Sequence, residues 1–475
     1  VKLRVGSDYP VWCRIDATEL RIEGGISYAD AVATAMLAEQ AGADAIHVSA
    51  YANPASGAAF TEAPLVHQPA GYLGYAQGIK QKLSIPVIAV GRIEPEEGDA
   101  AIASGKADFV AMGRKLLADP DLPTRLRQGR PDDIRPCIYC YTCVSRIFVN
   151  DHVRCAVNPA TGFEYETVVS PAEKPRKLLV VGGGPAGMEA ARIAAQRGHQ
   201  VRLAEQGRSL GGTAFFASVV YPENGRLVDY LKQQIAGSSV ELDLGVTVDE
   251  SYLDSFRPDA VIVATGARRD APDIPGVDQD NVFSGDEMRG LMTGHGAESA
   301  RSKLAFWQRW ALSLAGSLGI TRNAALLARL SHVWMPLGKQ VCIVGGGLVG
   351  AELAEFLALR GRKVSLIEES GKFAVELPLV RRWRLLEELK QLSVVMINHT
   401  RLLRVSGRQL AIDCQGSEVE IEADTVILAS GACGDLSLAE RAREMGYETH
   451  VAGDCDGVGY LEEAMRSAHQ VATAL

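Results

Sequence analysis

Four of the nine cysteines fall close together, with a spacing that suits metal binding: Cys137-x2-Cys140-x2-Cys143-x11-Cys155. A cubic 4Fe–4S cluster needs four cysteine thiolates, and three in a short run with a fourth at a distance meet that need. Structural zinc and buried cysteines without a ligand are the alternatives, although zinc cysteines usually come in two separated pairs. We therefore predict a 4Fe–4S cluster in a reducing compartment. The remaining cysteines lack such spacing and are predicted core residues: Cys13, Cys342, Cys414, Cys433 and Cys455.

A glycine-rich pattern occurs twice in the second half of the chain. Each copy follows an apolar stretch and precedes a helical one, and the copies read Gly182-Gly-Gly184-Pro-Ala-Gly187 and Gly345-Gly-Gly347-Leu-Val-Gly350. Such a strand–turn–helix unit brings backbone N–H groups and a helix N-terminus to a pyrophosphate. In both copies an acid that can hold ribose hydroxyls, Glu205 or Glu368, follows the first glycine by 23 residues (205 − 182 and 368 − 345). The repeat predicts two dinucleotide sites.

The choice of nucleotide at the second site depends on charge. An acid at Glu368 would repel a 2′-phosphate and therefore favours NADH. Arg360, Arg362 and Lys363 lie close in sequence and leave NADPH open.

Composition and charge exclude several classes of protein. The 475 residues are enough for two or three domains, and a net charge of −9 with mixed signs argues against a nucleic-acid-binding surface. The first eleven residues are charged and lack the apolar core of a signal peptide. The most apolar region, Leu304–Leu330, is interrupted by arginines, and we predict an amphipathic helical pair there. We expect a cytoplasmic protein without a nucleic-acid or membrane partner.

The first part of the chain alternates between strand-like and helix-like stretches. Ser27 with Asp30 forms a helix N-cap signature, and Gly42 is typical of a helix end. Alternation of this kind predicts parallel strands covered by helices. Four such units make half of an eight-stranded barrel, so we expect a preceding piece of about 200 residues. Strands are predicted at 11–15, 45–48, 87–90 and 109–112, and helices at 27–40, 73–83 and 96–104.

Further turns extend the repeat. Each glycine copy is followed by an apolar strand that ends in a small-residue turn, at Val261–Gly266 and at Val426–Gly431, and Gly453-Asp454 stands near the end. This order resembles the two-dinucleotide-domain flavoproteins, in which an NAD(P)H domain is inserted into an FAD domain. The resemblance implies that Gly453-Asp454 and Gly211-Gly212 contact FAD.

With the cysteine run included, the whole chain resembles the 2,4-dienoyl-CoA reductase and trimethylamine dehydrogenase group. The barrel of that group is of the old yellow enzyme type and holds FMN. The resemblance implies that Arg14 lies beside the flavin ring and that Gly91-Arg92 and Gly113-Arg114 hold the FMN phosphate. Loops after barrel strands 7 and 8 are a general phosphate site. The Cys140–Cys143 gap of two residues is nearer to the amine dehydrogenases than to the dienoyl reductases.

The expected fold class is α/β, with half of a TIM barrel followed by two Rossmann-like domains. The expected domains are the C-terminal half of an FMN barrel (1–135), a cluster segment with its linker (136–170), an FAD domain (171–290 and 446–475) and an NAD(P)H domain (291–445) with a helical insertion near 300–335. The residues predicted to contact FMN, FAD or the nicotinamide nucleotide are Arg14, Gly91, Arg92, Gly113, Arg114, Gly182, Gly184, Gly187, Glu205, Gly211, Gly212, Val246, Ala264, Gly266, Gly345, Gly347, Gly350, Glu368, Gly431, Gly453 and Asp454.

The resemblance implies NAD(P)H-dependent reduction of an activated C=C bond in an enoate, an enone or a 2,4-dienoyl-CoA-like substrate, through FAD, the cluster and FMN. One alternative is an amine dehydrogenase or demethylase that passes electrons to an electron-transfer flavoprotein. Another is an electron-transfer module for a separate barrel subunit. The oligomeric state, a homo-oligomer included, is left open.

No catalytic acid is assigned from the sequence. The group's reductases carry a His after the sixth barrel strand, where this chain reads Ser49-Ala-Tyr51-Ala-Asn53-Pro54. Tyr51 and His67 are conceivable donors but are more typical of pocket or packing residues. We expect the proton donor to lie in the preceding half-barrel, and this chain alone not to be a competent ene-reductase.

Overall fold

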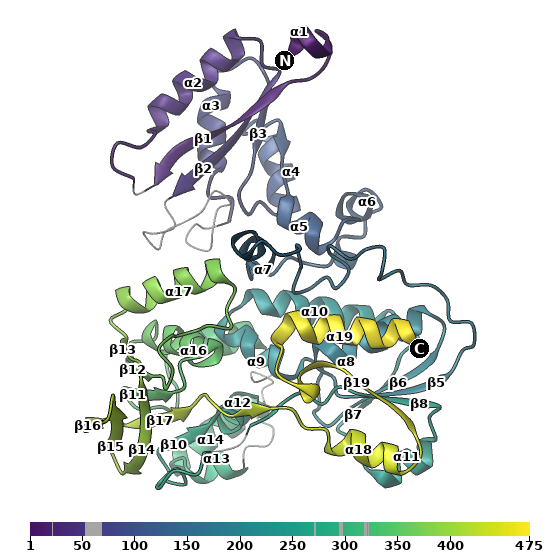
Figure 1. Cartoon of the computed structure of the whole chain (residues 1–475), viewed down its shortest axis with the longest axis vertical. Coiled ribbons are helices and arrows are strands. Elements are labelled where there is room, and N and C mark those ends of the chain that lie inside the picture. The colour runs from purple at the N-terminus through teal and green to yellow at the C-terminus, as the bar shows by residue number, and fades with distance from the viewer. Residues whose placement is uncertain (21, 53–68, 270–271, 294–297, 318–320, 322) are drawn as a thin grey trace. The chain divides into compact units, whose positions relative to one another are not determined.

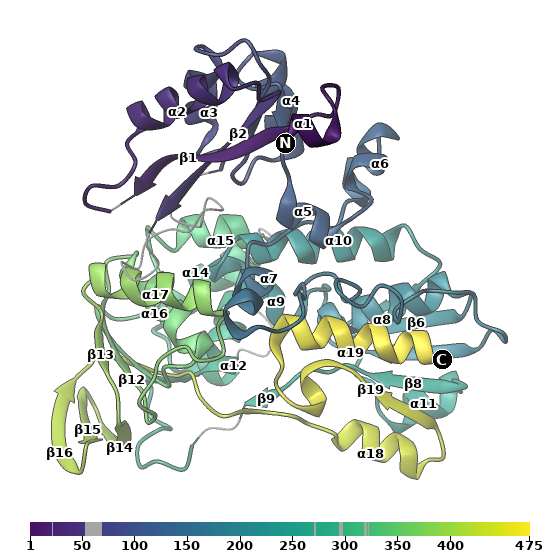
Figure 2. The ribbon, with the colours of Figure 1, turned by 45° about the horizontal axis from the view of Figure 1, so that its top comes forward.

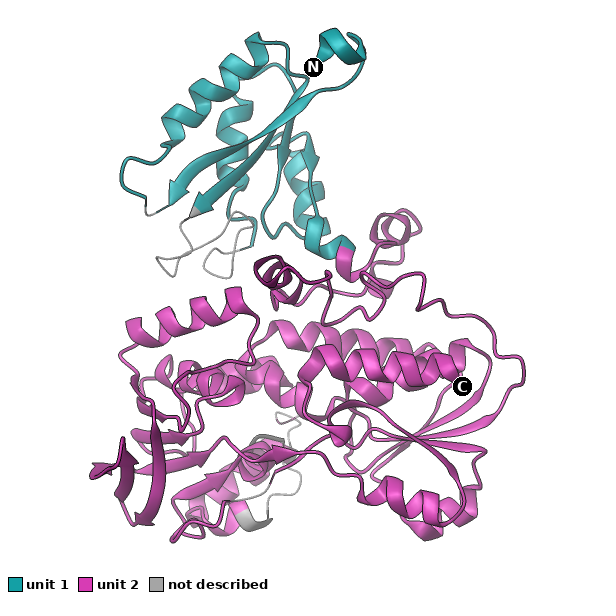
Figure 3. Ribbon diagram, in the orientation of Figure 1, with its two compact units in different colours: residues 1–116 teal, residues 117–475 magenta. Residues whose placement is uncertain are grey.

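The computed structural model describes the chain except for residues 21, 53–68, 270–271, 294–297, 318–320 and 322. It consists of two compact units, Val1–Leu116 and Leu117–Leu475, which Figure 3 shows in different colours.

The first unit is built on a parallel sheet with the strand order β1-β2-β3-β4 (Figure 1). Alternate strand residues such as Ile46 and Val48 pack against Ala35 and Ile79 of the covering helices. The sheet therefore buries one face under helices, as in a (β/α)8 barrel. Its elements are α1 (Lys2–Val5), β1 (Trp12–Leu20), α2 (Tyr28–Gln40), β2 (Ala45–Ala52), α3 (Leu73–Lys80), β3 (Val87–Ala89), α4 (Pro95–Ala103), β4 (Phe109–Val110) and α5 (Gly113–Ala118).

The predicted cap of α2 is confirmed. The Ser27 side chain accepts a hydrogen bond from the Asp30 amide, and the Asp30 side chain accepts one from the Ser27 amide. The first strand is longer than predicted, because β1 stays paired with β2 past a register shift between Asp16 and Glu19. Charged residues on the uncovered face of a strand hide its continuation from a hydropathy pattern.

The second unit contains two parallel five-stranded sheets, and the first has the order β19-β8-β5-β6-β7. The C-terminal strand β19 pairs with β8, so the chain returns to this sheet after building the second one. Figure 2 shows α19 lying along α8. Its elements are β5 (Lys177–Val181), α8 (Pro185–Gln196), β6 (Gln200–Glu205), α10 (Glu223–Ala236), β7 (Glu241–Leu244), α11 (Glu250–Phe256), β8 (Ala260–Val263), α18 (Ser437–Glu444), β19 (Glu448–Val451) and α19 (Tyr460–Ala474).

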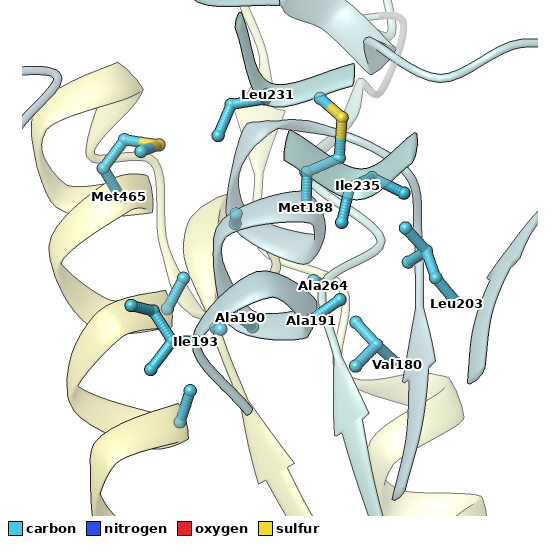
Figure 4. Packing of buried hydrophobic residues seen from close by; sticks show 14 of the residues in the cluster. Val180, Met188, Ala190, Ala191, Ile193, Leu203, Leu231, Ile235, Ala264 and Met465 are labelled. Atoms are coloured by element: carbon cyan, nitrogen blue, oxygen red, sulfur yellow. The ribbon is translucent and has the colours of Figure 1, made fainter. Parts of the chain in front are cut away.

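The first five-stranded sheet and the helices packed on it form the first dinucleotide fold. Its hydrophobic core lies between the sheet and the helices α8, α10 and α19. Figure 4 shows Val180 of β5 beside Ala191 of α8, and Met188 of α8 near Leu231 of α10. These side chains are at most 1% exposed. Burial of an aliphatic side chain stabilises the fold by about 1.5–3 kcal/mol, which fixes the helix at whose N-terminus the glycine loop lies.

The second sheet has the order β10-β17-β11-β12-β13 and carries a three-stranded antiparallel sheet, β14-β15-β16. Its two strands β11 and β12 repeat the parallel pairing of β5 and β6. Its elements are β10 (Val282–Ser284), β11 (Gln340–Val344), α16 (Leu348–Ala358), β12 (Lys363–Ile367), α17 (Leu379–Gln391), β13 (Val395–Ile397), β14 (Thr400–Ser406), β15 (Gln409–Cys414), β16 (Ser417–Glu422) and β17 (Thr425–Leu428).

Connecting elements join and flank the two sheets. The predicted helical pair is present as α14 and α15, and it packs on the second core through residues such as Leu312 and Leu327. Among the described residues, no helix is both long enough and apolar enough to cross a bilayer. The connecting elements are α6 (Leu122–Arg127), α7 (Thr142–Ser145), α9 (Gly212–Val220), β9 (Arg268–Arg269), α12 (Gly285–Thr293), α13 (Glu298–Ser302), α14 (Phe306–Ser317), α15 (Ala324–Leu330) and β18 (Ala432–Cys433).

Candidate functional site

The first glycine loop joins β5 to α8 and depends on the absence of side chains. Gly182 has φ +110°, and a Cβ there would lie 2.3 Å from the carbonyl oxygen of Ala264. A Cβ on Gly187 would lie 1.8 Å from the carbonyl oxygen of Gly182, so only glycine lets the helix approach its own loop. The backbone at Gly184 faces open space, since a Cβ built there meets nothing within 4 Å. The helix N-terminus is therefore accessible to a phosphate.

Glu205 closes this loop from the end of β6. Its two carboxylate oxygens accept hydrogen bonds from the amides of Gly183 and Gly207, each at 2.6 Å. A carboxylate has about four acceptor positions, so further positions are left for ribose hydroxyls.

A cavity of about 460 Å³ extends from the first loop. Asp454, which lies near the C-terminus in the sequence, also lines this cavity, and burial raises the pKa of its carboxyl group. Predicted residues that line the cavity are Gly182, Gly184, Glu205, Gly212, Ala264, Gly266 and Asp454.

The other residues predicted for this site lie beside the cavity rather than in its lining. The Gly211 amide bonds to the carbonyl of Gly183 at 2.8 Å, and the Val246 amide bonds to that of Glu205 at 3.1 Å. Gly453 packs against α8, where a Cβ would lie 2.8 Å from that of Ala186. These residues shape the loop through their backbones.

Two arginines in the cavity were missed by the sequence reasoning. Arg269 of β9 and Arg289 of α12 line the cavity, and both pair with Asp286, at 3.0 and 3.1 Å. Arg289 also donates to the Thr213 hydroxyl at 3.3 Å. No local motif marks them, because β9 and α12 reach the site only through the fold.

The second glycine loop repeats the first in geometry. A Cβ on Gly350 would lie 1.8 Å from the carbonyl oxygen of Gly345, and Glu368 accepts hydrogen bonds from the amides of Gly346 at 2.6 Å and Ser370 at 2.8 Å. Gly431 follows β17 with φ +83°. The predicted residues of this loop thus gather at the carboxyl end of the second sheet, as those of the first loop do at theirs.

A small, mostly apolar cavity of about 90 Å³ lies beside the second loop. It is lined by Leu348 and Glu352 of α16 and also by Thr213, Arg269 and Arg289, which line the larger cavity as well. The two cavities are therefore neighbours within one compact unit, and the second reaches its glycine loop at Leu348 and Val349.

The basic side chains that could have favoured NADPH at the second loop do not lie beside Glu368. Lys363 begins β12 and pairs with Gln340, at the opposite end of the strand from the loop. Arg360 donates to the Ser331 hydroxyl at 2.6 Å and to the carbonyl of Ala328 at 3.0 Å, which holds it against the end of α15.

The start of the cysteine run, from Cys137 to Tyr141, forms a tight loop before α7, and Cys143 lies within that helix. Tyr139 and Tyr141 are buried and have φ of +52° and +66°, a conformation that costs about 1–3 kcal/mol in residues other than glycine and is concentrated at functional sites. The Tyr139 amide lies 3.4 Å from Sγ of Cys137, and Sγ of Cys140 lies 3.4 Å from the Thr142 hydroxyl. The Tyr139 amide thus donates to the Cys137 sulfur, whereas the Cys140 thiol donates to the Thr142 hydroxyl; hydrogen bonds to sulfur of the first kind also occur around iron–sulfur clusters.

The cysteine side chains are reduced and only partly gathered. No disulfide joins them, and burial raises the pKa of the thiols of Cys140 and Cys155, to which the charges of neighbouring cysteines also contribute. Within the described part of the chain, no three His, Cys, Asp or Glu side chains are arranged to hold a metal ion. Cys137, Cys140 and Cys155 nevertheless pack against the core around α8, so three of the four predicted ligands are held at the sheet that carries the larger cavity.

A buried ion pair fixes the start of this cysteine segment, and no sequence motif indicated it. Arg135 donates to the Glu189 carboxylate of α8 at 3.1 Å, and both side chains are almost fully buried. Arg192 donates to the same carboxylate at 2.8 Å. Burial acts to raise the pKa of Glu189, but the charges of Arg135 and Arg192 outweigh it and hold the pKa well below its usual range.

In the first unit, Arg14 projects from the face of β1 opposite the helices. It donates to the Ser49 hydroxyl of β2 at 2.8 Å and lies in register with His47. Burial, with the charge of Arg14, lowers the pKa of His47. Tyr51 is the penultimate residue of β2, whereas His67 lies outside the described residues. Arg14, His47 and Ser49 thus form a polar group that could contact an anionic flavin or substrate.

The two Gly-Arg pairs lie at one edge of the sheet of the first unit. Gly91-Arg92 follows β3, Gly113-Arg114 begins α5 after β4, and these two strands are paired. Lys115, which is 6% exposed, bonds to Glu94 at 3.0 Å and ties the second loop to the first. The arrangement matches the general phosphate site of barrels.

Comparison with known protein families supports both units. Residues 176–456 match the family of pyridine nucleotide-disulphide oxidoreductases, and residues 1–133 match the NADH:flavin oxidoreductase / NADH oxidase family. The chain is 34% identical to an NADH oxidase of Thermoanaerobacter brockii over 99% of its own length and 67% of that protein. It is 29% identical to a cinnamate reductase of Clostridium sporogenes, again over 99% of this chain and 67% of that protein.

A solved structure is similar over the entire chain. The complex of 2-naphthoyl-CoA reductase with 2-naphthoyl-CoA superposes with a TM-score of 0.85 at 26% identity and covers 100% of this chain and 66% of that one. The chain thus spans about two thirds of the length of these proteins. The resemblance to the 2,4-dienoyl-CoA reductase and trimethylamine dehydrogenase group is confirmed, as is the α/β class with barrel and Rossmann-like parts. The chain belongs to the pyridine nucleotide-disulphide oxidoreductase family, with an NADH:flavin oxidoreductase part at residues 1–133.

Proposed function

We propose that this chain belongs to an NADH-dependent flavin and iron–sulfur oxidoreductase that reduces an activated C=C bond in an enoate, an enone or an acyl thioester. The observation that carries the proposal is the pair of matched dinucleotide loops whose cavities share Thr213, Arg269 and Arg289. Two dinucleotides that meet at one place suit hydride transfer between a nicotinamide and a flavin. Relatives named for the reduction of cinnamate and of 2-naphthoyl-CoA support the substrate class.

The residues present fit the cofactors proposed for them. The larger cavity, with Glu205 at one end and Asp454 lining it, would hold FAD, and the second loop with Glu368 would hold NADH rather than NADPH. Arg14 and the two Gly-Arg loops would hold FMN. The cluster would be held by Cys137, Cys140, Cys143 and Cys155, which supports a reducing, cytoplasmic compartment.

When bound, FAD would accept two electrons, the cluster would relay single electrons, and FMN would deliver hydride to the substrate. The protein sets distance and charge. Arg269 and Arg289, which both pair with Asp286, line both cavities and would stabilise negative charge on a reduced ring bound there. The Arg135–Glu189 pair holds the cysteine segment against α8, and Arg14 supplies a fixed cation in the first unit.

Anaerobic purification of the full-length protein that contains this chain, followed by counting of iron, sulfide, FMN and FAD, tests the proposal. NADH is then added while flavin absorbance is followed. About four irons with bound FAD, bleached by NADH and reoxidised by cinnamate or an enone, would support it. Bleaching by a secondary or tertiary amine but not by NADH would favour an amine dehydrogenase with electron-transfer flavoprotein as acceptor, and NADH without effect on bound flavin would refute the proposal.

A further inference from the structure

A carboxylate occupies the place where the second loop would receive a phosphate. Glu376 accepts a hydrogen bond at 2.9 Å from the amide of Leu348, the first residue of α16. A Cβ on Gly347 would lie 3.1 Å from its other oxygen, so this glycine makes room for the acid. The Ala374 amide bonds to the carbonyl of Gly346 at 2.7 Å and fixes the segment that carries Glu376. The first helical amide of α16 is therefore already bonded to an anion.

The first loop serves as an internal comparison. The repeats are offset by 163 residues (345 − 182 and 368 − 205), and the bond from Gly211 to Gly183 at 2.8 Å corresponds to that from Ala374 to Gly346. On this alignment Glu376 corresponds to Thr213, and Leu348 to Pro185, which has no amide hydrogen. At Gly184 a Cβ meets nothing within 4 Å, whereas at Gly347 it meets the Glu376 carboxylate. The same backbone thus presents an open helix N-terminus in one site and a filled one in the other.

The carboxylate is also close to the first site. Burial, together with the charges of Glu376 and Asp454, raises the pKa of the Tyr460 phenol to about 12. Tyr460 begins α19, directly after the segment that brings Asp454 to the larger cavity. The charge of Glu376 therefore acts at the start of α19 as well as at the second loop.

We propose that Glu376 is a specificity-determining residue of the second dinucleotide site: its carboxylate takes the position of the pyrophosphate and must be displaced when a diphosphate-bearing ligand binds. This inference rests on the proposed function, in which the second loop binds NADH. Anions compete for a helix N-terminus because its free amides and dipole favour a single negative group. Glu376 thus weakens every ligand with a diphosphate and leaves a ligand without one unaffected.

Binding of ADP-ribose, NADH and adenosine to the flavin-loaded protein tests this proposal by isothermal titration. The variants are E376Q, which removes the charge, and E376T, which installs the residue of the first site. Loss of a competing charge near the phosphates is expected to tighten ADP-ribose and NADH binding about tenfold, which corresponds to about 1.4 kcal/mol. Adenosine binding should stay within about twofold, because adenosine carries no phosphate.

E369Q is the matched control, since it removes the same charge from an exposed residue next to Glu368 but not at the helix N-terminus. Glu376 is exposed, so the variants are expected to fold, and unchanged FAD and iron contents verify this. Equal ADP-ribose affinity in the wild-type protein and E376Q would overturn the inference alone, as would an equal gain in E369Q or for adenosine. If neither protein bound ADP-ribose or NADH, the proposed function and the inference would both be wrong.

Discussion

The buried carboxylate of Glu189 is the sharpest test of how the cysteine segment is held to the first dinucleotide fold. The E189Q variant keeps the shape of the side chain and removes its charge. Glu189 is fully buried, and it accepts hydrogen bonds from Arg135 at 3.1 Å and from Arg192 at 2.8 Å, while Nδ1 of His469 lies 3.8 Å away. The substitution therefore leaves buried guanidinium charge without its counter-charge.

The expected loss follows from that burial. Removal of one partner of a buried ion pair costs about 3–5 kcal/mol, because the other charge stays desolvated. For a unit of this size, about 2 °C per kcal/mol gives a fall in Tm of roughly 5–10 °C. Hydrogen exchange should rise in residues 135–157 and in α8, since the pair joins these segments.

The pH dependence carries a definite sign. The pKa of Glu189 is held below its ordinary value of 4.5, so its charge stabilises the fold above that pH and the stabilisation is lost as the pH falls toward the lower pKa of the folded state. The difference in Tm between the wild-type protein and E189Q should be constant from pH 8 to pH 6 and should narrow below about pH 4.5.

Differential scanning fluorimetry with mass-spectrometric hydrogen exchange measures both effects. The control is E241Q, which breaks the pair between Arg202 and Glu241, whose side chain is 67% exposed. An exposed pair contributes about 0.2–1 kcal/mol, so this variant should lose no more than about 2 °C. Equal losses in the two variants, or exchange that rises everywhere alike in E189Q, would refute the reasoning.

Changes at other sites give further tests. Burial and Glu355 raise the pKa of Glu388 to about 7, so the stability contributed by its protonated form is present below about pH 4.5 and is lost as the pH rises through 7. Between pH 5 and pH 8, the Tm of E388Q relative to the wild type should therefore rise by an amount worth roughly 2 kcal/mol. A difference in Tm that does not vary with pH would contradict this. G350A should abolish bleaching by NADH with FAD content unchanged, and G187A should lose FAD. In each variant the new Cβ would lie 1.8 Å from a carbonyl oxygen of its own loop, and such overpacking costs about 1–3 kcal/mol or more. Similar effects of the two variants on FAD content would argue against separate sites. C155S should bind well under half of the iron that the wild-type protein binds, whereas the control C414S should keep all of it. Iron and sulfide analysis measures both, and a full iron content in C155S would rule out Cys155 as a cluster ligand.

Much of the fold could be predicted from the sequence because its signals are local. The capping box of Ser27 and Asp30 is set by residues three apart, and the structure has it. The two glycine loops were predictable because strand, turn and helix follow one another directly. The length of β1 was not, since its continuation past Ile15 depends on pairing with β2, a partner distant in sequence.

The candidate site shows the same division. Glu205 and Asp454 were predicted from motifs and line one cavity. Arg269, Arg289 and the Arg135–Glu189 pair had no local signal, because each is brought into place by elements that meet only in the folded chain. An isolated arginine in a sequence is most often a solvated surface residue, so its burial against a carboxylate cannot be inferred from composition.

The two dinucleotide loops also separate what a motif determines from what it leaves open. The glycines fix the backbone, and both copies make the same close contact between the last glycine of the loop and the first. The chemistry of each loop then depends on a residue more than twenty positions beyond the glycines. Glu376 bonds to the first helical amide of α16, whereas the corresponding Thr213 lines the cavity beside the first loop. Two loops with the same glycine contacts can therefore differ in how tightly they hold a ligand, and the proposed function calls for one site that retains a flavin and one that exchanges a nicotinamide nucleotide.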